Sequence, residues 1–299
     1  MLILLLIMYA LLGLTFVFGA LAMQYAAPVF FIGLRMGITS GLILGYLIFR
    51  RRDFKIKRED FLLFLILGIV HIFIPYVGEY FALKHVSPAK VSLIWSLGPF
   101  VTAFFAWFLF GERLTRIKFL GLLVGVFGFV PIILHESVGE RQLNSFLHIS
   151  TADLALFCIV ISSAFAWNLF KRLLQKGYKP LVLNGWAMLI GSVLAFMVSP
   201  FVEAWHPLPV THWPIVLACA AVLVLIGGII CYNIYGYMLR YYTTTFLSLA
   251  GGIIPFFTAL FQWVILGQSI SWAFFASMCV ITLGLVLFYK EELHPEYLR

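Results

Sequence analysis

The sequence is poor in charged residues. Asp, Glu, Lys and Arg make up 11% of its 299 residues, against roughly a quarter in a typical soluble domain. Hydrophobic residues account for 63%, and the mean hydropathy is +1.06. A water-soluble core of this size cannot hide so much apolar surface, so the composition excludes a soluble domain and indicates that lipid is the solvent.

Cysteine is scarce too, and it occurs in no recognisable motif. None of the four cysteines belongs to a CxxC pair, and all of them lie in apolar runs. This pattern is typical of small buried hydrophobic residues rather than of disulfides or metal ligands. The residues are Cys158, Cys219, Cys231 and Cys279.

Signatures of catalysis and of nucleic-acid binding are also missing. The sequence has no GxSxG, no HExxH, no Walker loop and no paired carboxylates. The net charge is +8, but no basic face is interleaved with aromatic residues. We therefore expect no enzyme, no cofactor, no metal and no nucleic-acid partner. Six histidines lie in loops or at chain ends without ligand spacing: His85, His135, His148, His206, His212 and His294.

Long apolar runs dominate what is present. A membrane-spanning helix needs roughly 17–25 apolar residues, and ten runs qualify. They predict an all-α membrane protein with ten transmembrane helices. The predicted spans cover residues 2–22, 28–49, 61–83, 88–110, 117–134, 152–171, 180–199, 214–239, 244–266 and 271–289.

The charges between these runs indicate the orientation of the chain. If the N-terminus is cytoplasmic, 16 Lys and Arg residues fall in the inner loops and the tail, and three fall outside. Such a bias is typical of the positive-inside rule. We expect both termini to be cytoplasmic. The three outer residues are Lys84, Lys90 and Arg141.

The chain contains an internal repeat. Residues 92–111 and 248–267 are identical at nine of twenty positions with an offset of 156, and the first two spans of each half match at an offset of 152. The pattern predicts a first repeat at 1–134, an external connecting loop at 135–151 and a second repeat with a short cytoplasmic tail at 152–299. Each repeat has five spans. Because five is odd, the second repeat is inverted, a symmetry that carriers use for alternating access.

Several short segments of the sequence form recognisable motifs. They are Gly13-Leu14-Thr15-Phe16-Val17, Ala82-Leu83-Lys84-His85 and Pro99-Phe100-Val101-Thr102-Ala103, with Phe110-Gly111-Glu112-Arg113-Leu114-Thr115 downstream. These segments resemble the EamA family of the drug/metabolite transporter superfamily. The resemblance implies a small-molecule carrier of an inner (plasma) membrane, often an exporter of amino acids or other metabolites. The sequence departs from the family pattern at Leu12, Leu14 and Gly267-Gln268-Ser269.

Two charged residues lie well inside the predicted spans. A charge at mid-membrane costs at least about 2.5–3.5 kcal/mol, so each needs a reason. Arg35 and Glu79 lie at similar depths, which makes an ion pair between them a hypothesis. Such a pair is either a static packing element or an outer gate or head-group site, whereas Arg35 could instead snorkel to the interface. Glu79 is also the candidate site for proton coupling.

Matched helix interruptions indicate where a transport site lies. Pro75 frees the carbonyl of His71 near the centre of its span. His71 is then either a hydrogen-bonded bundle residue, a substrate contact or a proton relay. Interruptions at corresponding places in two repeats are a pointer to the binding site. The other expected interruptions are Pro99, Pro255, Gly227 and Gly251.

We therefore place a cavity between the first, third, fourth, sixth, eighth and ninth spans. Its aromatic lining would suit apolar, flat or cationic solutes. The expected substrate-binding residues are Thr15, His71, Tyr76, Glu79, Tyr80, Trp95, Trp167, Asn168, Tyr232 and Asn233, with Tyr235 and Gln262 nearby.

The sequence thus predicts a carrier of a small organic metabolite, such as an amino acid or an aromatic or cationic solute, that works as an exporter. One alternative is an importer or exchanger of a larger metabolite such as S-adenosylmethionine or a nucleotide derivative. A membrane-embedded enzyme acting on lipid is a remote alternative. The expected partners are the substrate and the lipid bilayer, and proton coupling stays open.

Overall fold

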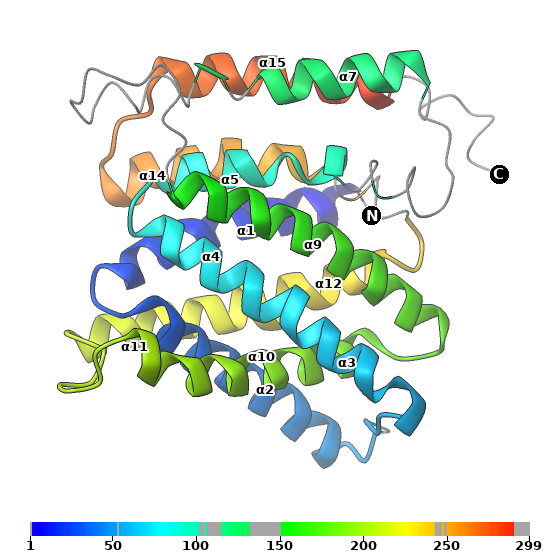
Figure 1. Cartoon of the computed structure of the whole chain (residues 1–299), viewed down its shortest axis with the longest axis vertical. Helices are drawn as coiled ribbons and strands as arrows, with labels where there is room; N and C mark the ends of the chain where they lie inside the picture. Colours follow the sequence, from blue (N-terminus) through cyan, green and yellow to red (C-terminus); the bar gives the residue numbers. More distant parts are fainter. Residues whose placement is uncertain are drawn as a thin grey trace.

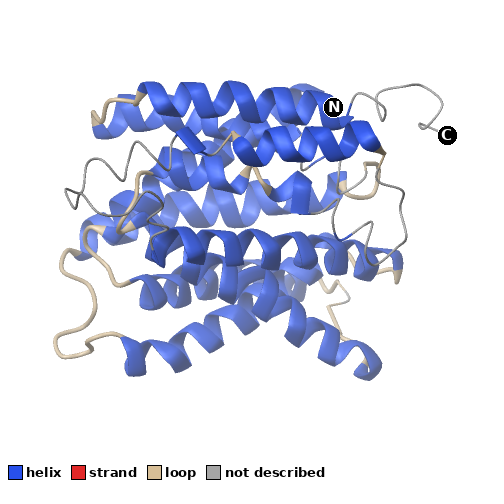
Figure 2. Cartoon of the chain, turned by 45° about the horizontal axis from the view of Figure 1, so that its top comes forward, coloured by secondary structure: helices blue, strands red, loops and turns tan. Residues whose placement is uncertain are grey.

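The computed structural model describes residues 2–52, 54–101, 105, 115–128, 130–131, 151–242, 247 and 250–289. Within these residues the protein is a bundle of helices, as Figure 2 shows. The one strand-like feature in this part of the chain is an isolated antiparallel bridge between Ala26 and Val210. The all-helical prediction is therefore confirmed for the described residues.

The helices begin and end close to the predicted boundaries. Prolines occupy the first turn of α2, α5, α10 and α11, where a missing N–H costs no hydrogen bond. The helices are α1 (Leu2–Met23), α2 (Pro28–Phe49), α3 (Phe61–Leu67), α4 (Ile74–Leu83), α5 (Pro88–Trp95), α7 (Arg116–Phe127), α9 (Thr151–Gln175), α10 (Pro180–Val202), α11 (Trp213–Val222), α12 (Tyr232–Met238), α14 (Ile254–Leu266) and α15 (Trp272–Tyr289). Four short segments are tighter or wider than an α-helix: the 3₁₀ turns η1 (Arg58–Asp60) and η4 (Gly251–Ile253), and the π-helical η2 (Gly68–Phe73) and η3 (Leu223–Cys231).

Six continuous helical segments are long and apolar enough to cross a membrane. Two shorter apolar helices, Gly251–Leu266 and Trp272–Phe288, follow in the last part of the chain. The predicted spans at 88–110 and 117–134 are described only in part, as α5 and α7. The six long segments are Ile3–Met23, Pro28–Phe49, Arg58–Leu83, Thr151–Gln175, Pro180–Val202 and Trp213–Met238.

The predicted connector and the family-like motif near its start fall mostly outside the described residues. Residues 135–150 of the connector are not described, and α9 begins at Thr151. Residues 110–114 of the motif and the tail 290–299 also lie outside the described part.

The helices lie side by side and form a layered bundle (Figure 1). The most extensive packing joins α2 to α10, α7 to α15, α1 to α14 and α4 to α9. The α7–α15 pair forms one edge of the bundle, at the top of Figure 1. Helices from the two halves of the sequence therefore alternate through the structure.

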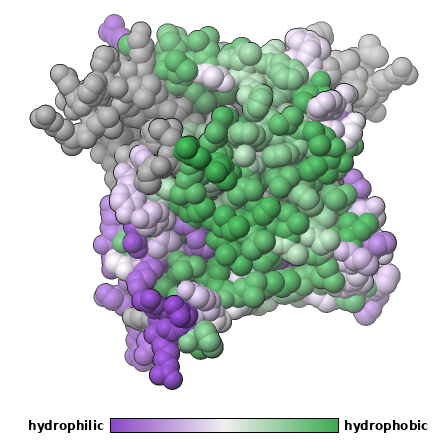
Figure 3. Space-filling view, turned by 180° about the vertical axis from the view of Figure 1, so that it is seen from behind, coloured by the Kyte–Doolittle hydropathy of each residue, from purple (hydrophilic) through white to green (hydrophobic). Residues whose placement is uncertain are grey.

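The outer surface carries a broad apolar band (Figure 3). Large hydrophobic side chains are exposed on the molecule, including Phe49, Phe201 and Trp272. Arg50 and Arg51 lie exposed beyond the end of α2. Such a surface is stable where lipid, rather than water, covers the apolar band.

Candidate functional site

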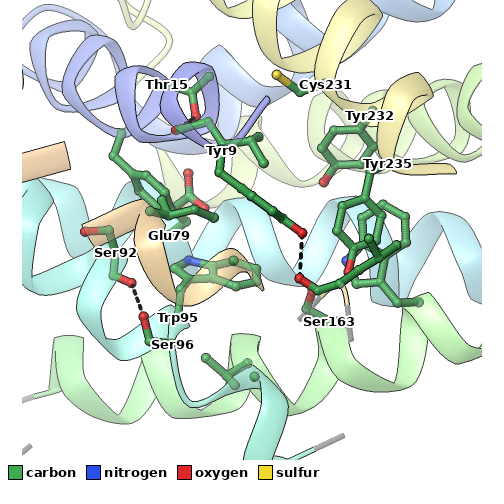
Figure 4. Close-up of a pocket in the computed structure, with 18 of the residues that line it drawn as sticks. Tyr9, Thr15, Glu79, Ser92, Trp95, Ser96, Ser163, Cys231, Tyr232 and Tyr235 are labelled. Atoms are coloured by element: carbon green, nitrogen blue, oxygen red, sulfur yellow. Dashed lines mark hydrogen bonds between the residues drawn. The ribbon is translucent and has the colours of Figure 1, made fainter. Parts of the chain in front are cut away.

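A cavity of about 160 Å³ lies inside the bundle. Segments α1, α4, α5, α9, η3 with α12, and η4 with α14 surround it, and these belong to the six spans named from the sequence (Figure 4). Its lining residues are Tyr9, Leu12, Thr15, Phe16, Tyr76, Glu79, Ser92, Trp95, Ser96, Gly98, Val160, Ser163, Ala164, Trp167, Cys231, Tyr232, Tyr235, Leu247, Gly251 and Ile254.

Three hydroxyl groups of the cavity wall already donate their proton to a backbone carbonyl. The hydroxyl of Ser92 donates to Ala89 O at 2.9 Å, and that of Thr15 donates to Leu12 O at 2.6 Å. The Tyr9 hydroxyl donates to Leu247 O at 2.6 Å. A hydroxyl has one proton and two lone pairs, so these groups keep only acceptor capacity for a solute.

Glu79 adds a carboxyl group to this wall. Among the described residues that line the cavity, Glu79 is the only Asp, Glu, Lys, Arg or His. Its side chain is 7% exposed. The indole N–H of Trp95 lies beside the carboxylate and makes no hydrogen bond of normal geometry with any described group. In Figure 4, Glu79, Trp95 and Ser92 lie on one side of the cavity and Tyr232, Tyr235 and Ser163 on the other.

The hypothesis of a direct ion pair between Arg35 and Glu79 is not met. Within the described part of the chain, the ion pairs shorter than 4.0 Å are Lys90–Asp153 and Lys176–Asp60. Arg35 instead donates to the hydroxyl of Tyr80, and its guanidinium carbon lies 4.8 Å from the centre of the Tyr76 ring.

Helical periodicity explains this outcome. Tyr76 and Tyr80 are four residues apart and share one face of α4, which α2 meets with Arg35. Glu79 is one residue before Tyr80, and 3.6 residues per turn place it about 100° away on the side of the cavity. Arg35 is 2% exposed, does not line the cavity, and therefore neither snorkels nor reaches a solute directly.

The two tyrosines at sequence-equivalent positions meet at the cavity wall. The hydroxyl of Tyr76 donates to that of Tyr232 at 2.7 Å across a sequence separation of 156 residues. This bond joins α4 to α12 and thereby joins the two halves of the chain.

Aromatic rings form the wall around Tyr232. The ring centres of Trp167 and Tyr235 are 4.1 Å apart, and those of Trp167 and Tyr232 are 5.6 Å apart. His71 lies behind them, 4.4 Å from Trp167 and 2% exposed. Neither ring nitrogen of His71 has a partner among the described groups, so the expected hydrogen bond is not seen.

Six of the ten expected substrate-binding residues line the cavity: Thr15, Tyr76, Glu79, Trp95, Trp167 and Tyr232. Four do not. His71 and Tyr80 lie behind the wall, Asn168 donates to Ala164 O at 2.9 Å, and Asn233 accepts from Asn184 at 2.9 Å. Gln262, also expected nearby, accepts from Ala89 N at 2.9 Å.

Other lining residues were missed in the sequence, although a periodic signal was present. Tyr9, Leu12 and Phe16 follow i, i+3, i+7 spacing and share the face of Thr15. Ser92 and Ser96 are one turn apart on the face of Trp95. Ser163 and Cys231 lie near Trp167 and Tyr232, but nothing in their local sequence marks them.

All five expected interruptions lie at or next to a change of helix type. Gly227 lies in η3, Gly251 begins η4, and Pro255 is in the first turn of α14. Pro75 is in the first turn of α4, directly after η2. The helix α5 ends at Trp95, and a turn at residues 96–97 precedes Pro99.

Comparisons with known proteins point to a common family. The sequence matches the profile of the EamA-like transporter family over residues 1–134 and 150–290. It is 28% identical to the S-adenosylmethionine/S-adenosylhomocysteine transporter of Chlamydia muridarum, over 95% of this chain and 89% of the relative. It is 26% identical to a probable amino-acid metabolite efflux pump of Salmonella typhimurium, over 92% of this chain and 90% of the relative.

A solved structure shares the fold. Titled "Crystal structure of protein", it superimposes with a TM-score of 0.67 and 18% sequence identity, and covers 95% of this chain and 93% of that one.

Proposed function

The chain belongs to the EamA-like transporter family, and we propose that it is a secondary carrier of a small organic cation that bears a flat ring. It is a multi-pass membrane transporter and not an enzyme. A sulfonium or ammonium metabolite of the S-adenosylmethionine class is the proposed substrate. S-adenosylhomocysteine, whose sulfur is a neutral thioether instead of a sulfonium, is the proposed exchange partner.

The observation that carries this proposal is the chemistry of the cavity. Its hydroxyl groups offer acceptor lone pairs, and Glu79 supplies the charge. The rings of Trp167, Tyr232 and Tyr235 offer faces for stacking and for cation–π contact. Acceptors, a carboxylate and aromatic faces together favour a cation over an anion, which argues against a phosphorylated substrate.

We further propose that the chain has ten spans in two inverted five-helix repeats, at 1–134 and 152–299, with 135–151 as an external connector. The packing pattern supports this: equivalent helices pack on each other, α2 on α10 and α7 on α15, as is expected beside a pseudo-twofold axis. An odd number of spans per repeat inverts the second repeat, which is a symmetry that many alternating-access carriers have. Both termini are then cytoplasmic, in an inner membrane.

An exporter of aromatic amino acids is the second candidate. The rings of Trp95, Trp167 and Tyr235 would then stack on the aromatic side chain of the substrate. Glu79 would then bind the ammonium group or carry a coupled proton. His71, Tyr80, Asn168 and Asn233 would support the wall rather than touch substrate, and Arg35 would act in coupling only through Tyr76 and Tyr80.

Counterflow in proteoliposomes tests the proposal. Vesicles loaded with unlabelled S-adenosylmethionine should accumulate labelled S-adenosylmethionine or labelled S-adenosylhomocysteine from outside. Labelled phenylalanine should enter the same vesicles much more slowly. Glu79→Gln should abolish entry of the cation, whereas Glu59→Gln, a matched change at an exposed residue of η1, should not.

Two results would contradict the proposal. One is exchange of phenylalanine faster than of the sulfonium compound, which favours the second candidate. The other is equal transport by the Glu79→Gln and Glu59→Gln proteins. A pH gradient that drives uphill uptake would add proton coupling.

A further inference from the structure

A strongly hydrophilic patch interrupts the apolar surface at one end of the bundle (lower left in Figure 3). In Figure 1 the same end is at the lower right, where α2 ends and α3 begins. The loop between these two helices is rich in cations, and residues 50–58 hold six Lys and Arg. All six are exposed: Arg50, Arg51, Arg52, Lys55, Lys57 and Arg58.

A second loop, from the other half of the sequence, lies against this one. The backbone N–H of Lys57 donates to the hydroxyl of Tyr178 at 3.1 Å, and that hydroxyl donates to Asp60 at 2.9 Å. Asp60 also accepts a hydrogen bond from the ammonium group of Lys176. This bond raises the pKa of Lys176, so the contact stays charged at physiological pH. The loop between α9 and α10 is therefore held beside the loop between α2 and α3.

Together the two loops concentrate most of the positive charge of the protein. Residues 50–60 and 171–179 contain ten Lys and Arg and three Asp and Glu, in a chain whose net charge is +8. We call the exposed Lys and Arg of residues 50–58 and 172–179 the basic patch. The positive-inside rule accounts for cations on one side of the membrane. It does not require loops from both halves to bring them to one place.

Within the basic patch, Arg51 has a backbone conformation that is unfavourable for arginine. The N–H of Arg51 donates to Ile48 O at 2.9 Å as α2 ends. The N–H of Arg52 donates to Leu47 O, also at 2.9 Å. This turn needs a left-handed residue, and Arg51 has a φ of 48°. Left-handed backbone brings the Cβ of any residue except glycine too close to a carbonyl oxygen.

The second loop shows the usual solution to the same problem. The N–H of Gly177 donates to Leu174 O at 3.0 Å, and that of Tyr178 donates to Leu173 O at 3.3 Å. The left-handed residue here is Gly177, with a φ of 96°. In the part of the chain that the structure describes, Arg51 is the only residue other than glycine with a positive φ. An arginine thus stands where glycine would cost less, which indicates a use for its side chain.

Exposed apolar side chains border the basic patch. Phe49, the last residue of α2, is 84% exposed, and Phe61, the first residue of α3, is 54% exposed. Tyr46 and Leu62, close to these two in the sequence, are exposed as well. Guanidinium groups bind phosphate oxygens in a bidentate way, and apolar side chains beside them suit a hydrocarbon tail. A molecule with a phosphate head and acyl chains matches both features.

We propose that the basic patch and these apolar residues form a binding site for an anionic phospholipid. The phosphate of the lipid lies on the arginines that follow α2, and its acyl chains lie along the exposed ends of α2 and α3. With the orientation proposed above, the site faces the cytoplasmic leaflet, whose surface is negatively charged. The site does not depend on the transported solute, so the counterflow assay does not decide it.

Native mass spectrometry of the full chain in a non-ionic detergent tests this proposal. Phosphatidylglycerol and phosphatidylcholine with the same acyl chains are titrated in turn. The affinity for phosphatidylglycerol should be higher by about tenfold or more. Inorganic phosphate at the same concentration should not displace this lipid, because it has no acyl chain to lie on Phe49 and Phe61.

Charge-removing variants locate the site. Arg51→Gly should weaken the binding of phosphatidylglycerol by about fivefold, which is the contribution expected of one cation near an anionic lipid. Changing Arg50→Gln and Arg52→Gln in the same protein should remove most of the preference over phosphatidylcholine. Lys84→Gln removes the same charge from an exposed residue at the end of α4, outside the patch, and should change neither affinity.

Thermal unfolding without added lipid separates this site from a role in folding. Arg51→Gly should raise the midpoint of unfolding by about 1–3 °C, because glycine removes the left-handed strain. The variant is therefore expected to be more stable and yet to bind the lipid less tightly. A lower midpoint would overturn the proposal, because Arg51 would then serve the fold.

Three binding results would also overturn the proposal. The first is equal affinity for the two lipids. The second is an equal loss of phosphatidylglycerol binding in the Arg51→Gly and Lys84→Gln proteins. The third is displacement of the lipid by inorganic phosphate at the same concentration, which would show that the patch binds free phosphate instead.

Discussion

The two sides of the cavity are built from the same positions of a duplicated sequence, yet they differ in chemistry. Six pairs of equivalent residues line it, each pair 152 or 156 residues apart. The backbone geometry has thus been retained while the side chains have diverged. The pairs are Leu12 and Ala164, Thr15 and Trp167, Tyr76 and Tyr232, Glu79 and Tyr235, Trp95 and Gly251, and Gly98 and Ile254.

Two of these pairs show the difference in chemistry between the halves. The first half supplies the carboxylate of Glu79, where the second half has the phenol of Tyr235. The second half supplies Trp167, where the first half has the small Thr15. A symmetric scaffold can therefore present an asymmetric site, which is what an asymmetric solute with a charged end and a flat end requires.

The same divergence accounts for the buried arginine. Gly227, the equivalent of His71, leaves the space in which the guanidinium of Arg35 lies, and a Cβ there would be 2.9 Å from its amino nitrogen. One half fills this place with its own imidazole, and the other fills it with a cation from α2.

We expect the largest effect on transport when Glu79 is replaced by tyrosine, the residue at the equivalent position 235 of the second half. Glu79→Tyr should lower kcat/KM for S-adenosylmethionine by about 100-fold, because a buried charge partner is lost. S-adenosylhomocysteine, which lacks the sulfonium, should be affected much less. Tyr235→Phe, measured in the same transport assay, should change both by about threefold or less, as expected for one neutral hydrogen bond. An equal fall in kcat/KM for both solutes would show that Glu79 does not recognise the positive charge of the sulfonium.

Exchanging the residue types at His71 and its equivalent Gly227 should lower the stability of the protein. His71→Gly should leave a void against Trp167 and cost about 2–3 kcal/mol. Gly227→His should be worse, because Arg35 occupies the place. Adding Arg35→Ala should then recover part of the loss, since contacting residues are not additive. Thermal unfolding in detergent measures all three; a double variant as unstable as the sum of the single changes would contradict this assignment of space.

The tyrosine pair should respond symmetrically. Tyr76→Phe and Tyr232→Phe each remove the same 2.7 Å bond, so each should cost about 1 kcal/mol of stability. The double variant should cost little more than either single one. Unfolding measurements on the three proteins close this double-mutant cycle, and strict additivity would mean that the two hydroxyls act independently.

The smallest effect is expected at Gly251, the equivalent of Trp95. A Cβ at this position would lie 3.5 Å from the Tyr9 ring, an ordinary contact. Gly251→Ala should therefore leave transport within about twofold and stability within about 0.5 kcal/mol. Gly251→Trp, which copies the first half, should instead fill the cavity and block counterflow. Counterflow at the unmodified rate by the Gly251→Trp protein would show that the solute does not pass position 251.

The sequence predicted the helices well because lipid leaves the backbone few choices. The span predicted at 28–49 coincides with α2, from Pro28 to Phe49. It also pointed to six of the residues that line the cavity, since repeat equivalence located the interruptions. It failed for Asn168 and Asn233, each next to a lining residue, because one step along a helix turns a side chain by about 100° away from its neighbour's direction.

By itself, the sequence determined that the chain is a bundle of apolar helices and that its sequence contains an internal repeat. Both follow from hydropathy and residue spacing, which can be read from the sequence without knowing which helices contact each other. Only the tertiary structure decided that Arg35 meets tyrosines rather than Glu79, and that α4 packs along α9 more extensively than α12 packs along α1. Those outcomes depend on how helices rotate and approach one another. That is set by contacts between distant side chains, such as Gly78 with Ile159, which no run of sequence contains.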